Sequence, residues 1–506
     1  MNGQAGNEQA VNGQAMNGQS ENHRSMKVRT ENNQPVNDRL VNAQLVNDQP
    51  LNGQEGSDWR SSEHAELVNA QTSAGAVDYE AAPNPFANKL TCKMFELLEA
   101  LSRFGGGPPG GGITRLLYTP AWLEAQLFLA EQMNLAGLEV RFDRVGNLYG
   151  RLEGTEPGRA VILTGSHIDT VRHGGKYDGA LGVAASLAAV VSLKERYGVP
   201  KQTLEVVSFC EEEGSRFPFA YWGSGSVTGE LVLERCGLIR DGDGVTLQEA
   251  MLAAGFGRPE QAEPRRSDLG AYVEVHIEQG IVLERTGTEI GIVETIAGQR
   301  RYTVDIHGEA NHAGTTPMGM RRDALAGAAE MMVLLEKMAL AEGPPLVATV
   351  GRLDLSPNTS NVIPGGASFT LDIRHESADA LEAFCGRVSE AFAGIAAARG
   401  LKLAQQLQLE APPAPMDAGL GGRLERLCSS RGLSCRRMVS GAGHDAQLLA
   451  AVCPAAMLFV PSRGGISHAP EEYTAPEQLA RGTELLAALL HQLAYEEEAA
   501  QEGEEK

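Results

Sequence analysis

The stretch Ala160-Val-Ile-Leu-Thr-Gly-Ser-His-Ile-Asp-Thr170 and the nearby Tyr177-Asp-Gly179 decide how this chain is interpreted. The apolar run at 160–163 predicts a buried strand, which would deliver His167 and Asp169 to its carboxyl end. In open α/β sheets, sites are built at that end. An imidazole brought together with Asp169 and Asp178 suits a divalent metal such as zinc or manganese. The same pattern also fits a capped strand end followed by a turn aspartate, so the rest of the chain has to decide.

Three further strand-like runs lead to residues that can bind metal. The run 203–209 leads to three glutamates at 211–213, the run 271–275 leads to His276, and the run 455–460 leads to His468. Three consecutive carboxylates at the end of a core strand are costly unless a cation neutralises them, although they would also fit a solvated acidic turn. Because these strands alternate with helical patterns, the sequence predicts an α/β layer fold.

The segment from about 295 to 412 interrupts this alternation. Its patterns follow the order strand, helix, strand, strand, helix, which predicts a small α+β domain inserted into the larger one. Its polar clusters contain His312, Asn361 and Arg374. A lid that carries such groups over a metal site would exclude water and orient a substrate. Alternatively, His312 caps a helix and Arg374 pairs with Asp372.

The two ends of the chain differ in composition from its middle. Residues 1–84 carry Asn at every fifth position over long stretches, a period that fits neither a helix nor a strand. This composition predicts a disordered Asn/Gln-rich leader, although a pentapeptide solenoid is conceivable. The domains that we expect are the leader, a discontinuous metal-binding domain at 85–295 and 412–495, an inserted lid domain at 296–411, and an acidic tail at 496–506.

The overall composition excludes some classes of partner. The 506 residues are enough for about two to four domains. With 42% hydrophobic and 21% charged residues, the chain resembles soluble globular proteins that bury a large core. The 65 acidic residues outnumber the 43 basic residues, which gives a formal net charge of −22. Such a charge disfavours a phosphate backbone, so we expect no nucleic acid partner.

The cysteines and the hydropathy of the chain indicate the cytoplasm. The seven cysteines are scattered and never follow a Cys-x-x-Cys spacing, which is typical of reduced thiols in a cytosolic protein. No apolar run approaches the roughly 18 residues of a membrane span. The amino terminus lacks a basic segment that leads into an apolar one. We therefore expect a cytoplasmic protein without a membrane partner.

Taken together, the motifs resemble the amidase, hydantoinase and carbamoylase branch of the dinuclear metallopeptidase superfamily. The resemblance runs from about 86 to 495 and keeps the motifs in order. They are Gly-Ser-His167-Ile-Asp169-Thr, Tyr-Asp178-Gly, Glu212-Glu213-Gly, His276-Ile-Glu-Gln279-Gly, Asn-His312-Ala-Gly-Thr-Thr-Pro, Asn361-Val-Ile-Pro-Gly, Arg374, Gly-Ala-Gly-His444-Asp and Ser-His468-Ala-Pro-Glu. This resemblance implies a metallopeptidase-like catalytic domain, with a central sheet and helices on both faces, and an inserted ferredoxin-like lid that forms a homodimer. The branch lacks the repetitive leader.

The resemblance also implies two divalent metal ions per subunit, manganese or zinc. His167 and His276 would hold one ion, and Glu213 and His468 would hold the other. Asp178 would bridge the two ions. Because neighbouring residues at a strand end diverge, one glutamate can bind metal while the glutamate beside it stays free for proton transfer.

Further roles follow from the same resemblance. Glu212 would be the general base that deprotonates the bridging water, and His312 would stabilise the tetrahedral oxyanion. Asp169 would accept a hydrogen bond from the histidine two residues before it and fix its tautomer. His444 would have a structural or supporting role. The residues expected to bind the substrate are Gln279, Asn361 and Arg374, with Arg374 taking a carboxylate as a bidentate fork.

Within this branch, the run Glu-Glu-Glu-Gly-Ser-Arg-Phe-Pro that begins at Glu211, and Gly298-Gln-Arg-Arg-Tyr-Thr303, most resemble allantoate amidohydrolases. We therefore expect hydrolysis of a ureido C–N bond of allantoate, a small molecule with a carboxylate, in purine and ureide catabolism. Ammonia and carbon dioxide would be released. N-carbamoyl-L-amino-acid hydrolases share much of the pattern and are the nearest alternative. A non-catalytic scaffold would require a broken site, yet every expected ligand type is present.

Overall fold

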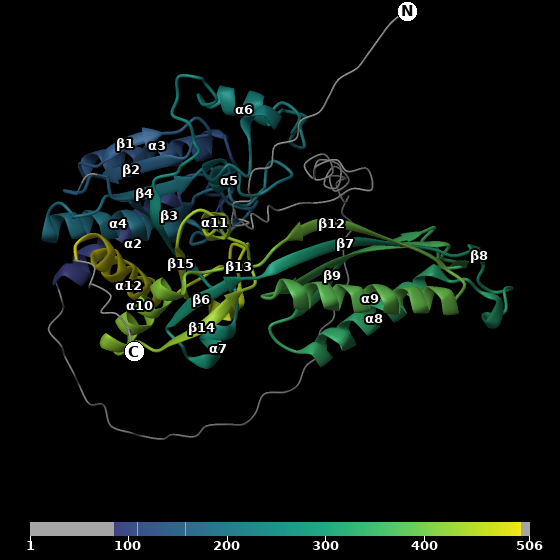
Figure 1. Cartoon of the computed structure of the whole chain (residues 1–506). Helices are drawn as coiled ribbons and strands as arrows, with labels where there is room; N and C mark the ends of the chain where they lie inside the picture. Colours follow the sequence, from purple (N-terminus) through teal and green to yellow (C-terminus); the bar gives the residue numbers. More distant parts are fainter. Residues whose placement is uncertain (1–84, 109, 157, 497–506) are drawn as a thin grey trace, which may run out of the picture.

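The computed structural model describes residues 85–108, 110–156 and 158–496 (Figure 1). The predicted disordered leader at 1–84 lies outside the described residues, as does the acidic tail beyond Glu496. Within the described ranges, no helix is both long enough and apolar enough to cross a membrane.

A mixed sheet forms the centre of the larger part of the molecule. Its strand order is β1-β2-β4-β3-β5-β15-β6-β13, and β14 pairs with β6. The strands are β1 (Glu139–Phe142), β2 (Leu148–Leu152), β3 (Val161–His167), β4 (Leu204–Phe209), β5 (Leu269–Ile277), β6 (Ile290–Ile296), β13 (Ala414–Pro415), β14 (Cys435–Ser440) and β15 (Ala455–Val460). The adjacent strands β4, β3, β5 and β15 run parallel, so their carboxyl ends lie at one edge of the sheet. The sequence predicts the functional residues at this edge.

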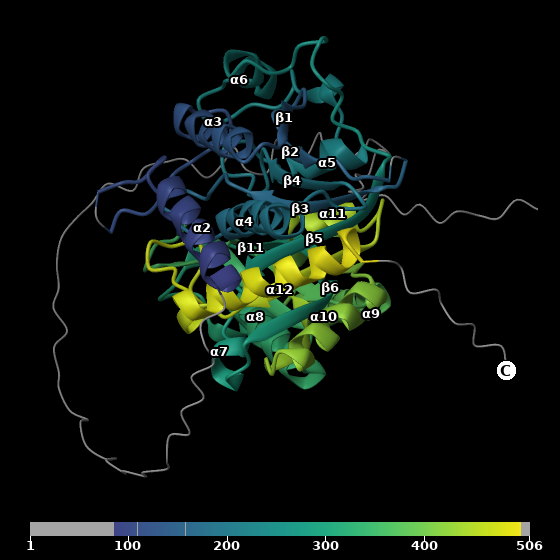
Figure 2. The ribbon, with the colours of Figure 1, turned by 90° about the vertical axis from the view of Figure 1, so that its left-hand side faces the viewer.

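Helices cover both faces of this sheet (Figures 1 and 2). One core contains residues of α2 (Pro85–Leu101), α3 (Pro120–Leu135), α4 (Ala180–Tyr197), α6 (Leu247–Ala253), α10 (Ala418–Ser430) and α12 (Pro476–Ala494). The other core contains residues of α5 (Trp222–Thr228), α7 (Val282–Thr286) and α11 (Asp445–Leu449). Along β3, Ile162 belongs to the first core and Leu163 to the second. The apolar run that precedes His167 is therefore buried on both sides, as predicted.

Local sequence explains where helices begin. The hydroxyl oxygen of Thr119 accepts a hydrogen bond from the backbone N–H of Trp122, and Pro120 occupies the first helical position of α3. The predicted start of this helix is therefore confirmed. Helix α6 begins with a capping box, in which Thr246 and Glu249 each accept a backbone N–H from the other.

A second, four-stranded antiparallel sheet projects from the larger part (Figure 1). Its order is β12-β7-β11-β9, with β7 (Gly298–His307), β9 (Val347–Ser356), β11 (Gly366–His375) and β12 (Lys402–Ala411). Helices α8 (Ala324–Glu342) and α9 (Ala378–Ala398) pack on it around a separate core. The predicted order strand, helix, strand, strand, helix is present. The strand β12 was not predicted, because its Gln-rich sequence contains no β-branched residue.

The polar clusters with His312 and Asn361 lie at the outer end of this segment, whereas Arg374 lies at its inner end. At the outer end, β8 (Asn311–His312) pairs with β10 (Val362–Ile363), far from the first sheet (Figure 1). At the inner end, the chain passes from β6 to β7 at residue 297 and returns from β12 to β13 at 412–413. We propose that residues 296–411 form one inserted domain between these two crossings.

Candidate metal centre

His167 ends β3 and is buried. Its Nδ1 lies 3.2 Å from Oδ1 of Asp169, while its Nε2 faces Asp178. The carboxylate of Asp169 also accepts hydrogen bonds from the backbone N–H groups of Glu212 at 3.1 Å and Glu213 at 3.0 Å. Asp169 therefore orients the His167 ring and joins the segments that follow β3 and β4.

Asp178 lies between two groups of side chains. Its Oδ1 is 3.3 Å from Nε2 of His276 and 3.7 Å from Nε2 of His167. Its Oδ2 is 3.2 Å from Nε2 of His468, and Oε2 of Glu213 lies 3.5 Å from the same His468 atom. Within each group, His167 with Asp178 and His276, and Asp178 with Glu213 and His468, the donor atoms lie within 4.8 Å of one another. One carboxylate oxygen faces each group, which is the arrangement of a bridging ligand.

The donor set of the two groups fits divalent metal ions. Two ligand atoms bound tetrahedrally at about 2.1 Å from zinc lie ~3.4 Å apart, close to the 3.2–3.7 Å between donor atoms here. Burial raises the pKa of Glu213 to about 8, because a buried carboxylate loses its hydration. Oε1 of Glu213 is buried without a hydrogen-bond partner among the described residues. A cation would neutralise this carboxylate.

Glu212 lies beside the two groups without belonging to either. Its Oε2 is 3.9 Å from Nε2 of His167. Its backbone N–H donates to Asp169, and its carbonyl oxygen accepts a hydrogen bond at 3.1 Å from the backbone N–H of Tyr221. The backbone is therefore held on both sides, which places the carboxylate where it can exchange a proton with a water molecule at the centre.

Gln279 belongs to the same centre. Its Nε2 donates to Oδ2 of Asp178 at 2.8 Å and lies 3.2 Å from Nε2 of His468. The backbone of Gln279 has a φ of 55°, in the left-handed region that non-glycine residues seldom adopt. Such strain is found at functional sites, where the surrounding structure holds it.

His444 packs against His276, one of the metal-ligand candidates. Its ring stands edge-on to that of His276, with 4.6 Å between ring centroids, and its Nε2 lies 3.1 Å from Oγ of Ser440. Ser440 donates its own hydrogen to the carbonyl of Ala442, so it accepts from His444. Burial lowers the pKa of His444 well below its usual value, which keeps the ring neutral. Glu274, His276 and His444 form a third group of closely spaced donor atoms.

Arg374 reaches from β11 of the second sheet towards the first. Its Nε and Nη2 donate to the carboxylate of Asp372 at 2.8 and 3.1 Å, which is the pairing that the sequence left open as an alternative. Its Nη1 donates to the carbonyl oxygen of Gly441 at 2.6 Å. Gly441 begins the motif that contains His444, so Arg374 is in contact with the loop beside the metal centre.

His312 and Asn361 are not brought to the centre in this structure. Both are exposed, His312 in β8 and Asn361 directly before β10. Nδ1 of His312 accepts a hydrogen bond from the backbone N–H of Gly314 at 3.1 Å, within its own loop. No helix begins there, so the alternative that His312 caps a helix is wrong. Among the described residues, neither side chain has a hydrogen bond or ion pair with the metal-ligand candidates.

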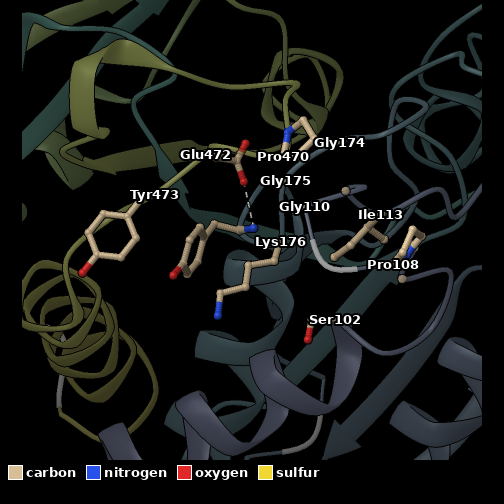
Figure 3. Close-up of a pocket in the computed structure, with 14 residues that line it drawn as sticks. Ser102, Pro108, Gly110, Ile113, Gly174, Gly175, Lys176, Pro470, Glu472 and Tyr473 are labelled. Atoms are coloured by element: carbon tan, nitrogen blue, oxygen red, sulfur yellow. Dashed lines mark hydrogen bonds between the residues drawn. The ribbon is translucent and has the colours of Figure 1, made fainter.

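Two supporting residues were missed in the sequence. Arg115 is buried, and its guanidinium donates to the carbonyl oxygens of Ile168 and Leu101. Glu472 is buried and accepts a hydrogen bond from the backbone N–H of Tyr177 at 2.9 Å (Figure 3). It also lines a cavity of about 350 Å³ beside the loop that contains Tyr177. The sequence offered one signal for Arg115, because a single arginine among apolar residues suggests a buried, paired side chain.

Comparison with known proteins now places the chain. The sequence model of peptidase family M20/M25/M40 matches residues 163–492. This chain belongs to peptidase family M20/M25/M40. The prediction of a hydrolase with a metallopeptidase-like α/β fold is thereby confirmed.

Known relatives align with this chain over nearly their whole length. An allantoate amidohydrolase of Bacillus subtilis is 48% identical over 80% of this chain and 99% of its own. An N-carbamoyl-L-amino acid amidohydrolase of Geobacillus stearothermophilus is 40% identical over 80% and 98%. The crystal structure of an amidase of the hydantoinase/carbamoylase family from Burkholderia multivorans has a TM-score of 0.76 and 35% identity, and covers 80% of this chain and 98% of its own. The predicted hydantoinase/carbamoylase branch is confirmed.

Proposed function

We propose that this chain hydrolyses allantoate at a ureido C–N bond, with two divalent metal ions per subunit, manganese or zinc. One observation carries the proposal: the carboxylate of Asp178 presents one oxygen to each of two groups of metal-binding side chains. The likeness to an allantoate amidohydrolase at 48% identity supports the choice of substrate. Water would add to the ureido carbonyl, and ammonia and carbon dioxide would be released.

The metal-binding residues divide into two sets that share Asp178. His167, His276 and Asp178 would hold one ion, and Asp178, Glu213 and His468 would hold the other. When bound, such ions polarise a carbonyl and lower the pKa of water towards about 7. Asp169 keeps Nε2 of His167 turned towards Asp178 by holding the opposite ring nitrogen.

Glu212 would move the protons of the reaction. Its carboxylate would accept a proton from the attacking water and deliver it to the nitrogen that leaves. The hydrogen bonds of its backbone with Asp169 and Tyr221 fix the position from which it acts. His444, held neutral behind His276, would keep the ring of His276 in place.

The second sheet would supply the contacts to the substrate. Arg374 already reaches the metal-centre loop at Gly441, and its guanidinium suits the carboxylate of allantoate. Gln279 would contact the substrate at the centre itself. His312 and Asn361 are exposed at the outer end of the inserted domain, so they would act after this domain closes or on the site of a second copy of the chain. We propose that the inserted domain is both a lid and the dimerisation surface.

Hydrolysis of N-carbamoyl-L-amino acids is the second candidate. It would use the same metal centre, and Arg374 would bind the α-carboxylate. The relative from Geobacillus stearothermophilus supports it at 40% identity, against 48% for the allantoate amidohydrolase.

A direct comparison of substrates tests the proposal. The metal-free full chain would be supplied with manganese, and ammonia release would be measured with allantoate and with N-carbamoyl-L-amino acids. We expect a higher kcat/KM for allantoate. Faster turnover of the carbamoyl compounds would overturn the choice of allantoate, and inactivity towards both with manganese bound would overturn the proposed chemistry.

A further inference from the structure

Glu472 is a buried acidic residue that the proposed mechanism does not use. It is 5% exposed and lies behind the loop that carries Asp178. Its Oε1 accepts the backbone N–H of Tyr177 at 2.9 Å and the backbone N–H of Asp178 itself at 3.2 Å. Figure 3 shows the first of these bonds as a dashed line from the carboxylate of Glu472 to the backbone nitrogen that follows Lys176.

The other oxygen of Glu472 accepts a hydrogen bond from the segment that carries His468. Oγ of Ser467 lies 2.8 Å from Oε2 of Glu472 and 3.1 Å from Oδ2 of Asp178. Ser467 directly precedes the metal-ligand candidate His468. The backbone N–H of Glu472 also donates to the carbonyl of Ala469 at 3.1 Å, which folds the chain back beneath His468. One carboxylate thus connects the backbone of Asp178 with the segment that carries His468.

The loop before Asp178 is shaped around this carboxylate. Gly175 lies so close to Glu472 that a Cβ atom at position 175 would overlap the carboxylate group. Two backbone N–H groups converge on one oxygen, and the glycine leaves room for it. The position of Asp178 is therefore set by Glu472 at the backbone and by Gln279 at the side chain.

From this arrangement we infer that Glu472 is a positioning residue that holds Asp178 between the two metal-binding groups. The inference rests on the proposed metal-dependent function. Among the described residues, Glu472 belongs to none of the groups of closely spaced metal-binding atoms. A glutamine at this position keeps only one acceptor oxygen, so it cannot accept from the Asp178 loop and from Ser467 on two separate oxygens as the carboxylate does, and the connection between the two segments is broken. Partners that orient metal ligands typically change metal affinity by about 10–100-fold when they are removed.

The matched pair Glu472→Gln and Glu471→Gln tests this inference. Glu471 is the exposed neighbour, so both substitutions remove one negative charge at adjacent positions. Manganese binding to the metal-free full chain would be measured by titration calorimetry. We expect Glu472→Gln to bind manganese about 10–100-fold more weakly, with the metal-free protein still folded. Glu471→Gln should bind like the unaltered chain, and excess manganese should restore the turnover of Glu472→Gln with an unchanged KM.

The possible results distinguish a failure of the proposed metal-dependent function from a failure of the positioning role. If the unaltered chain binds no manganese or zinc, the proposed metal-dependent function fails. If it binds two ions and Glu472→Gln binds them as tightly, only the positioning role is overturned. Should Glu472→Gln fail to fold, Ser467→Ala decides instead, because it removes a single hydroxyl from the same connection. Weaker manganese binding by a folded Ser467→Ala supports the role, and unchanged binding contradicts it.

Discussion

The metal-ligand candidates and the polar residues of the inserted domain differ in how completely the structure assembles them. His167, Asp178 and His276 are buried at one edge of the first sheet, with donor atoms within 4.8 Å. His312 and Asn361 are exposed at the outer end of the second sheet. One set is assembled within a single chain, whereas the other set lies apart from the metal-ligand candidates.

The two sheets explain this difference. Parallel strands place all their carboxyl ends at the same edge, so β3, β4, β5 and β15 bring distant residues together through sheet pairing alone. The antiparallel second sheet carries Arg374 within β11, but His312 and Asn361 lie on short segments beyond its end, at β8 and β10. Under the proposed function, the fold of the first sheet alone would assemble the groups for the chemical step, whereas substrate binding would depend on how the two parts approach each other.

The substitution Glu212→Gln should have the largest effect on activity. It removes the proton acceptor and keeps the shape of the side chain, so we expect turnover to fall about 10²–10⁴-fold. Because Glu212 belongs to neither donor group, manganese content should stay the same. His167→Ala is the contrasting variant and should lose metal. Equal loss of metal from both variants would contradict the division between ligand and base.

The independence of the two parts can be tested in the core of the second sheet. Phe369 is 1% exposed in a cluster separate from the main core, and Phe369→Ala should destabilise that part by about 3–5 kcal/mol. Manganese binding should persist, because the ligand candidates lie on the other sheet. Calorimetric unfolding would show whether only one transition moves.

Leu353 provides the control for this change. It pairs with Phe369 across β9 and β11 but is 40% exposed, so Leu353→Ala should have a much smaller effect on unfolding. A single transition that shifts together with metal binding in Phe369→Ala would show that the two parts unfold as one unit.

His312→Ala tests whether the outer motif serves catalysis. Removing a donor to a developing oxyanion typically costs about 10²–10³-fold in turnover. Because His312 lies far from its own metal centre, we expect it to act on a second copy of the chain. Mixing His312→Ala with Glu212→Gln should then restore activity to about one quarter, since half of randomly formed dimers carry one intact site. No recovery in verified mixed dimers would place His312 in its own site.

The sequence predicted those site residues whose positions depend only on where the buried strands end. The runs before His167, His276 and the glutamates at 211–213 form buried strands, so their carboxyl ends could be anticipated. Arg115 and Glu472 were missed because their roles depend on contacts with residues 53 and 294–295 positions away. Such contacts have no periodic signal. The bond from Gln279 to Asp178 was equally hidden, because it depends on an unusual backbone conformation.

Arg374 links the two parts of the molecule, and its substitution should have the smallest of these effects. In this structure its guanidinium is shared between Asp372 and the carbonyl of Gly441. A carboxylate substrate would compete with Asp372 for the same donors or use the edge turned towards Gly441. We expect Arg374→Ala to raise KM about 10–100-fold with little change in kcat, because a hydrogen bond to a charged group contributes about 1.5–3 kcal/mol.

Arg301→Ala is the matched control for Arg374→Ala. Arg301 also donates to Asp372, at 3.1 Å, but no contact joins it to the Gly441 loop in the described part of the chain. If Arg374 binds the substrate, Arg301→Ala should raise KM much less than Arg374→Ala, because Arg374 stays in place and Asp372 keeps its hydrogen bonds from Arg374 and Gln299. If both variants raise KM equally, the ion-paired cluster around Asp372 shapes the inserted domain, and Arg374 does not bind the carboxylate. A fall in kcat alone would show that Arg374 acts in the chemical step and not in substrate binding.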